Sequence, residues 1–510
     1  MAACTLTLRA AHRALSRSLR DIDSEKADEI WSIWDGILNC SPWNIAIDKL
    51  RQSGVELIEQ ACLIARHEAL EFELGPESRQ VANRLIHDRL EPYAVNGSLP
   101  ENTVLIGGPP CQAYSLVGRA RNRGKEDYRP EQDHRHFLYK EYLQVIAEFR
   151  PAVFVMENVK GILTSTVEGK RIFESIKSDL RHPGRVCGIQ DREGYVLVSL
   201  VKGSDGSLLP PEPAAEDFIV RAELLGLPQA RHRVIICGVR EDVFERAGRR
   251  VGTLMATPPT SVDEVIGDLP SLRPSLSWRG GDALWLSSFE LPMFTDACRE
   301  LESAERTELR HVATRMKAAV ENMRLSDPGS GSDRLAVRLH SKSKSHSDWY
   351  ADRPIRLLAN HESRSHMRED LVRYLFVSVF GAVCGSSPRL EDFPRALLPN
   401  HRNVDPNNVA AAIFKDRFRV QLRGMHSMTV TSHIGKDGHA FIHPDPVQCR
   451  SLSVREAARL QTFPDSYVFL GNRTSQYTQV GNAVPPMLAH RIGSLVGGVL
   501  QQAGLSSRTA

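Results

Sequence analysis

The chain has 510 residues, of which 41% are hydrophobic and 25% are charged, and its formal net charge is +3. This composition excludes a wholly disordered chain, and the charge alone is too small to indicate nucleic-acid binding. The nine cysteines are scattered and lack the paired spacing of zinc sites or disulfides. We therefore expect a reducing, cytoplasmic setting with no bound metal, and with no membrane partner because apolar stretches such as residues 374–384 are too short to span a bilayer.

The N-terminal segment, residues 1–95, is expected to be mostly helical. Residues 5–13 have a helical pattern with no capping residue before it, and Ile30, Ile33 and Ile37 recur at helical spacing. None of the glycines in this segment follows a strand-like run, as the glycines of a nucleotide-binding loop do.

The most informative segment is residues 105–112, in which an apolar run leads through Gly-Gly-Pro-Pro to Cys111. Pro109 and Pro110 fix the backbone before the thiol, and a cysteine thiolate is a strong nucleophile. The alternative is a small buried cysteine in a turn, and this segment alone leaves both interpretations open.

A second polar cluster follows the apolar run of residues 152–156, which has the composition of a buried strand and ends at Glu157. A carboxylate at the end of a buried strand is costly unless it has a function. The alternative is a helix N-cap, because an amphipathic stretch at residues 172–180 follows.

A third cluster lies in residues 227–239, where the chain enters an apolar strand. Alternation places Arg231 and Arg233 on the same side, as two guanidinium groups directed one way. The alternative is a solvated pair of charges at the edge of a sheet.

Two further segments lie near the C-terminus. Residues 450–461 have the pattern of a capped helix, because Ser453 and Glu456 fit a capping box. Residues 479–486 are expected to form a rigid turn, followed by a last helix over residues 487–501.

These segments, in this order, resemble the DNA cytosine-5 methyltransferases of bacterial restriction-modification systems. The resemblance covers residues 96–505 and implies an α/β fold of the S-adenosylmethionine-dependent, Rossmann-like type, with a mainly parallel sheet and a smaller target-recognition domain. The matching motifs are Pro-Pro-Cys-Gln at Cys111, Glu-Asn-Val at Glu157, Gln-x-Arg-x-Arg at Gln229, Arg-Glu-x-Ala-Arg-Leu-Gln-x-Phe-Pro at Arg455 and Gln-x-Gly-Asn-x-Val-Pro at Gln479.

The chemistry explains these residue types. Carbon 5 of cytosine is a poor nucleophile until another nucleophile adds at carbon 6, and Cys111 suits that role. Glu157, with a pKa raised by burial, can bind ring nitrogen 3, and Asn158 is expected to orient Glu157. Arg231 and Arg233 are expected to stabilise the thiolate and the carbonyl oxygen of the base. The target base must leave the duplex, so base flipping is also expected.

The resemblance also implies residues that bind DNA and cofactor. Residues 112–124 correspond to the loop that closes over double-stranded DNA, and its expected DNA contacts are Gln112, Ser115, Arg119, Arg121 and Arg123. S-adenosylmethionine is expected to lie beside Gly107, Pro109, Gly481, Asn482 and Val484. The alternative for the last three is a tight turn, and the alternative for the loop is a basic surface segment.

Four regions are expected along the chain. The region expected to recognise the target is rich in arginine, lysine and histidine between residues 334 and 368, and a solvated linker is its alternative. The four regions are a helical segment over 1–95, a catalytic core over 96–240, the recognition region over 241–425 and a return to the catalytic domain over 426–510.

The start of the chain departs from the family. The glycine-rich turn Asp-x-Phe-x-Gly-x-Gly-Gly, which approaches the cofactor, is not found before Cys111. We therefore expect an N-terminally incomplete domain, which arises from a truncated gene, a misassigned start codon or a split gene whose second chain supplies the missing strands.

Three functions remain open. The first is a cytosine-5 methyltransferase, alone or with a second chain, located with the bacterial nucleoid. The second is a remnant that binds DNA and flips cytosine without transferring a methyl group. The third is a thiol hydrolase that pairs Cys111 with His134 or His136, but this leaves Glu157 and both arginines without a role.

Overall fold

The computed structural model describes the chain in two compact units. The first comprises residues 1–70, 226–230 and 259–486, and the second comprises residues 71–225, 231–258 and 487–510. Cys111 and the segment expected to contact DNA, from Gln112 to Arg123, lie outside the described residues. The described residues are 1–42, 44–109, 139–167, 170–189, 194–205, 212–277, 285–324, 329–335, 347–351, 358–400, 404–405, 408 and 416–505.

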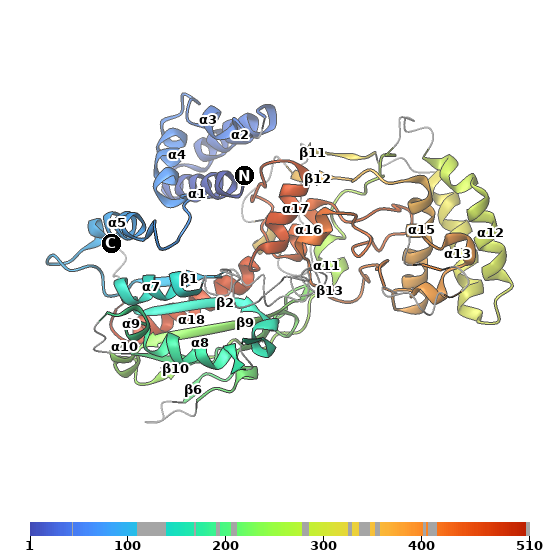
Figure 1. Ribbon diagram of the computed structural model, residues 1–510. Coiled ribbons are helices and arrows are strands. Elements are labelled where there is room, and N and C mark those ends of the chain that lie inside the picture. The colour runs from blue at the N-terminus through green and yellow to red at the C-terminus, as the bar shows by residue number, and fades with distance from the viewer. Residues whose placement is uncertain are drawn as a thin grey trace. The chain divides into compact units, whose positions relative to one another are not determined.

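A mixed β-sheet forms the centre of the second unit (Figure 1). Its order is β1-β2-β9-β5, and β7 also pairs with β9. β1 and β2 run parallel, as expected, whereas β9 runs antiparallel to β2, β5 and β7. The α/β class is confirmed, and the antiparallel β9 makes the described sheet mixed. The strands are β1 (Val104–Gly107), β2 (Val153–Val159), β5 (Tyr195–Val198), β7 (Ile219–Arg221) and β9 (His232–Arg240).

Helices cover both faces of this sheet. Tyr142 and Ile146 of α7 and Phe173 and Ile176 of α8 share one buried core with Phe154 of β2. Figure 1 shows α18 on the side of the sheet opposite to α8. The apolar runs of β2 and β9 are therefore buried on both faces, as the continuous run at residues 152–156 indicates. These helices are α7 (Tyr139–Phe149), α8 (Ile172–Arg181) and α18 (Pro486–Gln502).

The remaining elements of the second unit are short. They are α5 (Arg79–Leu90), η1 (Glu91–Tyr93), η4 (Lys160–Thr164), β3 (Thr166–Val167), β4 (Lys170–Arg171), α9 (Pro183–Cys187), β6 (Ser204–Asp205), η5 (Ala215–Phe218), η6 (Ala222–Leu224), α10 (Glu241–Arg246) and β10 (Arg250–Val251).

The outer edge of β1 is exposed. Among the described residues, β1 pairs with β2 alone. Val104 is 36% exposed and Ile106 is 71% exposed, although both residue types are typical of buried strands. An apolar edge strand of this kind is a surface on which a further strand can pair.

The first unit begins with four helices that pack together. Leu15, Trp34 and Ile58 share a core with Val468 and Leu470 from the C-terminal part of the same unit. The first helix begins without a side-chain cap, as the sequence indicates, whereas Asp23 caps the second helix through the amides of two following residues. Helices account for most of residues 1–95, although the boundary between the two units falls at residue 70. The four helices are α1 (Ala2–Ser18), α2 (Ser24–Cys40), α3 (Ala46–Leu50) and α4 (Glu56–Glu68).

The region expected to recognise the target contains a helical core. α15 (Arg368–Cys384) packs mainly against α13 (Thr307–Arg324), which also packs against α12 (Pro292–Glu302), and residues 370–381 of α15 are all buried. The apolar residues 374–381 therefore belong to a protein core.

The first unit has further, mostly short elements, of which Figure 1 shows β11, β12 and α11 near α16 and α17. They are β8 (Gln229–Ala230), α11 (Val262–Ile266), η8 (Leu286–Glu290), β11 (Gly331–Leu335), α14 (Ser347–Tyr350), β12 (Leu358–Glu362), η9 (Leu390–Asp392), η10 (Arg395–Leu397), β13 (Ser427–Met428), η12 (Ser432–Gly435), α16 (Val454–Leu460) and α17 (Arg473–Asn482).

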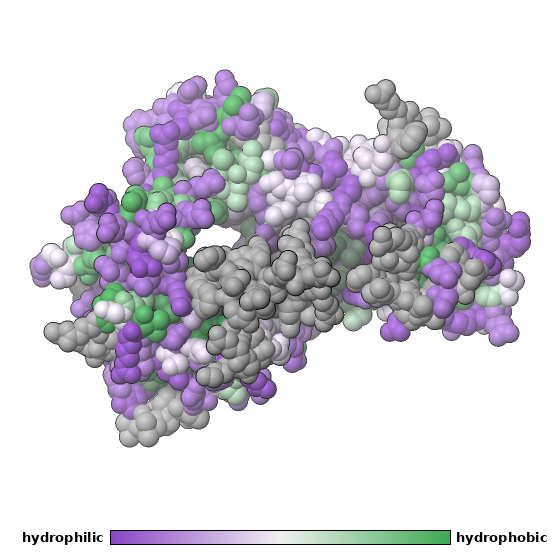
Figure 2. All heavy atoms as spheres, in the orientation of Figure 1, coloured by the Kyte–Doolittle hydropathy of each residue, from purple (hydrophilic) through white to green (hydrophobic). Residues whose placement is uncertain are grey.

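The surface is largely hydrophilic. Figure 2 shows hydrophilic residues over most of the described surface on this face, with smaller hydrophobic areas between them. In the part of the chain that the structure describes, no helix has both the length and the apolar content needed to cross a membrane.

Gly238 provides a test of the packing of the sheet. It lies opposite Phe154 in the β2–β9 pair, and a Cβ atom there would come within 2.2 Å of the Phe154 ring. We expect Gly238→Ala to lower the free energy of unfolding by about 1–3 kcal/mol, because the buried ring must move. Gly36→Ala is the control, since Gly36 lies exposed in α2 with open space around it, and it should stabilise the chain slightly. Urea unfolding measures both, and equal effects of the two variants would contradict this packing.

Candidate active site

Glu157 and Arg233 form an ion pair at the end of the central sheet. The register places Val159 opposite Arg233 and Glu157 opposite Ile235, so Glu157 and Arg233 lie on the same face. Arg233 Nε lies 2.8 Å from Glu157 Oε1, and the two side chains are 16% and 22% exposed. Glu157 lies within β2 and is therefore not a helix N-cap.

A second buried cation adjoins this pair. Arg231 is 2% exposed, and burial together with the neighbouring Arg233 lowers the pKa of Arg231 to about 9. Burial also lowers the pKa of Arg233, and Glu157 opposes that shift. Arg231 is therefore close enough to Arg233 and Glu157 to interact with both electrostatically, and this local excess of positive charge favours a group on which negative charge develops.

Asn158 does not orient Glu157 through its side chain. Successive strand residues face opposite sides of a sheet, and the side-chain Oδ1 of Asn158 accepts a hydrogen bond of 2.8 Å from the Val159 N–H. The expectation from the sequence is wrong on this point, because Arg233 is the residue that holds Glu157.

Gly107 and Gly108 carry the chain from β1 past two side chains. A Cβ at Gly108 would lie 3.2 Å from Glu157 Oε2, and a Cβ at Gly107 would lie 2.6 Å from the Tyr142 ring. A side chain at Gly107 would therefore displace the Tyr142 ring, and one at Gly108 would crowd the Glu157 carboxylate. This close approach places the end of β1, which leads to Pro109, beside the Glu157 carboxylate.

A cavity of about 440 Å³ lies beside the same strand end. Its walls include Gly107 and Pro109 together with apolar and acidic side chains from the preceding extended segment, residues 72–74. The volume is in the range of small-molecule sites, and the mixture of Phe72 with Glu73 and Glu141 fits a ligand that has an aromatic base and a positive charge. S-adenosylmethionine meets this description.

The other residues expected to hold the cofactor lie in the first unit. Gly481 is in the last turn of α17, so the expected turn begins later, after Asn482. A Cβ at Gly481 would lie 2.2 Å from the Ser432 backbone nitrogen, and this close backbone contact explains the glycine. Asn482 is exposed and Val484 is half-buried.

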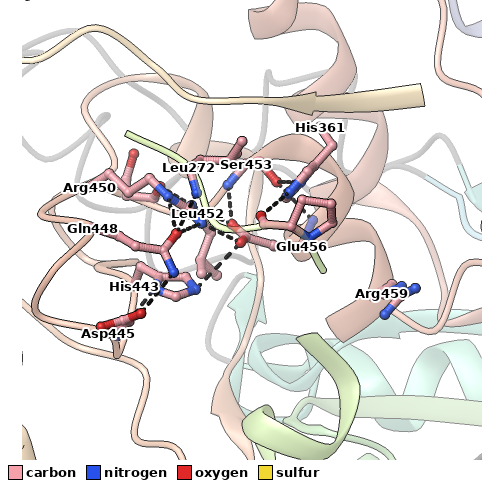
Figure 3. Close-up of polar contacts among 12 residues, drawn as sticks. Leu272, His361, His443, Asp445, Gln448, Arg450, Leu452, Ser453, Glu456 and Arg459 are labelled. Carbon is pink, nitrogen blue, oxygen red and sulfur yellow. Dashed lines mark hydrogen bonds and ion pairs between the residues drawn. The ribbon is translucent and has the colours of Figure 1, made fainter. Parts of the chain in front are cut away.

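A polar network surrounds the start of α16 (Figure 3). Arg450 donates two hydrogen bonds of 2.6 Å to the Glu456 carboxylate, and both residues are buried. Burial disfavours the Glu456 carboxylate, but Arg450 outweighs this and lowers the pKa of Glu456. Ser453 and Glu456 form the expected capping box. His361 contacts Ser453, with 3.0 Å between Nδ1 and Oγ.

Two more buried arginines extend from α16. Arg455 donates to the backbone carbonyl oxygens of Ala359 and Tyr467, and Arg459 binds Asp465. Both guanidinium groups are fully buried. The motif around Arg455 therefore joins α16 to the surrounding segments of the first unit rather than forming a catalytic site.

Gln229 and Gln461 are two site residues to which sequence reasoning gave no role. Both amides are fully buried and contact one another, and Gln461 also reaches the end of α17. Both residues belong to the motifs that carry the resemblance, and this was the one feature of the sequence that could have indicated a role for them.

Similarity to known proteins shows the family to which the chain belongs. The family model for the C-5 cytosine-specific DNA methylase matches residues 84–187 and 216–497, more than half of the chain. The chain belongs to this family. Like the other members, it is a DNA (cytosine-5-)-methyltransferase, and the resemblance in the sequence is confirmed.

Several relatives are named as type II methyltransferases. M.Bpa9945I of Bacillus paralicheniformis is 33% identical over 398 residues, which cover 78% of this chain and 70% of the relative. M.AgeI of Thalassovita gelatinovora is 27% identical over 419 residues, covering 77% and 82%. DNA (cytosine-5)-methyltransferase 1 of Gallus gallus is 25% identical over 417 residues, covering 76% and 24%.

The network around α16 predicts a loss of stability in mild acid. Burial lowers the pKa of His443 to about 3 and that of His361 to about 4. An unfolded histidine titrates near pH 6.5, so the unfolded methyltransferase binds more protons below that pH. The contribution of these two neutral histidines to the free energy of unfolding is complete above pH 6.5. It is lost as the pH falls towards their pKa values in the folded protein. We expect each histidine to cost about 1 kcal/mol between pH 7.5 and 5.5.

Urea unfolding at both pH values measures this loss. His443→Gln should reduce the difference in the free energy of unfolding between pH 7.5 and pH 5.5. His490→Gln, at an exposed position of α18, should leave this difference unchanged. A difference that persists unchanged in His443→Gln would show that His443 is not responsible.

Proposed function

We propose that this methyltransferase transfers a methyl group from S-adenosylmethionine to carbon 5 of a cytosine flipped out of double-stranded DNA, through a transient bond between that cytosine and Cys111. The observation that carries the proposal is the cluster of Glu157, Arg233 and Arg231 at the end of β2 and β9. Membership of the family supports it.

Each of the proposed catalytic residues has a separate role in methyl transfer. The Cys111 thiolate forms a bond to carbon 6, and the electron pair of the carbon 5–carbon 6 double bond moves into the ring. Glu157 binds ring nitrogen 3, and Arg231 and Arg233 stabilise the negative charge that develops on the base. Bound S-adenosylmethionine supplies the methyl group on a sulfonium. The carbon 5 proton then leaves to water, and the bond from sulfur to carbon 6 breaks.

Covalent geometry supports a site that includes Cys111. Gly108 lies beside the Glu157 carboxylate, and Cys111 follows three residues later. Three residues of extended chain span at most about 11 Å, a distance that is compatible with a role for Cys111 beside Glu157.

Cofactor and DNA contacts complete the proposal. Gly107 and Pro109 would hold S-adenosylmethionine in the cavity at the end of β1, and Gly481 and Asn482 at the end of α17 and Val484 in the following turn would also bind the cofactor. The loop residues Gln112, Ser115, Arg119, Arg121 and Arg123 would contact DNA, and the region 241–425 would select the target. A DNA substrate implies a cytoplasmic, nucleoid-associated enzyme.

The roles of Cys111 and Glu157 can be tested by substitution. We expect Cys111→Ser to abolish methyl transfer to duplex DNA, because a hydroxyl is a much weaker nucleophile. We expect Glu157→Gln to slow single-turnover transfer by about a hundredfold, because a general acid is lost. Glu212→Gln is the control, since Glu212 forms surface ion pairs with Lys177 and Arg181, and it should retain the parent rate. Turnover by Cys111→Ser within about tenfold of the parent would contradict the nucleophile.

One observation favours a second arrangement, in which another polypeptide supplies strands for the cofactor site. The outer edge of β1 has no strand partner among the described residues, and the cavity lies beside that edge. We propose that such a strand would pair with β1 and close the cavity. Without it, the chain would bind and flip cytosine but transfer nothing.

Calorimetry separates the two arrangements. A chain that is active alone should bind one S-adenosylmethionine per molecule and methylate cytosine in duplex DNA. A chain that needs another polypeptide should bind duplex DNA but give no heat with S-adenosylmethionine. Stoichiometric cofactor binding by the isolated chain would contradict the requirement for a second chain.

A further inference from the structure

The amide of Gln461 links two parts of the first unit that lie far apart in the sequence. Gln461 directly follows α16 and is fully buried. Its Nε2 donates to the carbonyl oxygens of Val480 at 2.7 Å and Ala483 at 3.1 Å. Its Oε1 accepts a hydrogen bond from Gln229 Nε2. Each end of this side-chain amide is therefore used.

The two carbonyl groups belong to the end of α17. The last four carbonyl groups of a helix lack partners within the helix, and a buried one costs free energy unless another donor reaches it. Gln461 donates to carbonyl groups on both sides of Gly481 and Asn482, and the Val480 carbonyl also accepts a longer hydrogen bond of 3.4 Å from the Ala483 N–H. The backbone around these two residues is thus held by a side chain from a different element.

Gln229 anchors the other end of the link. Its Nε2 also donates to the Leu460 carbonyl oxygen at 2.9 Å, and its Oε1 accepts from the Val430 N–H at 3.1 Å. β8, which contains Gln229, pairs in parallel with β13. The chain continues from β8 directly into Arg231 and Arg233.

We propose that Gln461 is a positioning residue that fixes the turn after α17 against β8. Resting on the proposed function, this means that Gly481 and Asn482, which would contact the cofactor, keep a fixed place relative to the strand that leads to the two catalytic arginines. Gln461 itself touches no reacting atom. Its loss would therefore weaken cofactor binding and leave DNA binding intact.

Gln461→Met tests this link, because methionine has a similar length and no hydrogen-bonding amide. Gln476→Met is a matched control. Gln476 is also buried, but its Nε2 donates at the other end of α17, to the Gly471 carbonyl oxygen at 2.9 Å. The two variants should lose similar thermal stability, since each removes the hydrogen bonds that a buried side-chain amide donates to backbone carbonyl groups.

The first measurement is amide hydrogen exchange of the methyltransferase over residues 479–486 and 226–230. We expect Gln461→Met to speed exchange in both segments by about tenfold, and Gln476→Met to change it by less than about twofold. If either variant fails to fold, Gln461→Asn and Gln476→Asn give the same comparison, because the shorter amide cannot span the same groups.

The second measurement is the dissociation constant for S-adenosylmethionine, with that for duplex DNA alongside. We expect Gln461→Met to raise the cofactor constant about tenfold and to leave the DNA constant within about twofold, whereas Gln476→Met changes neither beyond that limit. Unchanged exchange in Gln461→Met, or equal effects of the two variants, would overturn the positioning role. If the parent binds no cofactor, the proposed function fails on that point, while hydrogen exchange still decides the role of Gln461.

Discussion

The antiparallel register of β2 and β9 determines which side chains meet at the end of the central sheet. Val159 lies opposite Arg233, so Glu157, two residues earlier on the same face, reaches the Arg233 guanidinium. A slip of one residue would turn Glu157 and Arg233 to opposite faces, because side chains alternate along a strand. Apolar residues of both strands, such as Phe154 of β2 and Ile236 of β9, stabilise this register because they share a buried core with α7 and α8. The charge arrangement of the site thus depends on the packing of an apolar core.

The first unit contains several buried arginines, whose charges need partners in the interior. Arg450, Arg455 and Arg459 are fully buried around α16, and an unpaired buried guanidinium would cost several kcal/mol (on the order of 3–5). Each is instead satisfied, by Glu456, by backbone carbonyl groups or by Asp465. Such a network specifies one arrangement of the segments that it joins, because any other arrangement leaves charges without partners. The Gln229–Gln461 contact is a similar buried link made by neutral amides, and it reaches the end of α17, where Gly481 lies.

Local features were predictable from the sequence, and features set by distant contacts were not. The capping box of Ser453 and Glu456 and the last helix depend on residues a few positions apart, and both are confirmed. The direction of β9 depends on how the chain returns to the sheet, so the expected parallel sheet proved mixed. Asn158 follows Glu157 in a motif, but the pleat turns the two side chains apart. The hydrogen bond between Gln461 and Gln229 joins residues 232 positions apart, and no local sequence pattern predicts it.

The central claim is that the sulfur of Cys111 bonds to cytosine during methyl transfer, and trapping tests it most directly. Duplex DNA that contains 5-fluorocytosine at the target position cannot lose the group at carbon 5, so the bond from sulfur to carbon 6 should persist. The account predicts a denaturation-resistant complex that forms only with S-adenosylmethionine, with the DNA attached to the peptide that contains Cys111. Methylation of ordinary DNA by a protein that never traps the fluorinated substrate, or attachment at another residue, would contradict it.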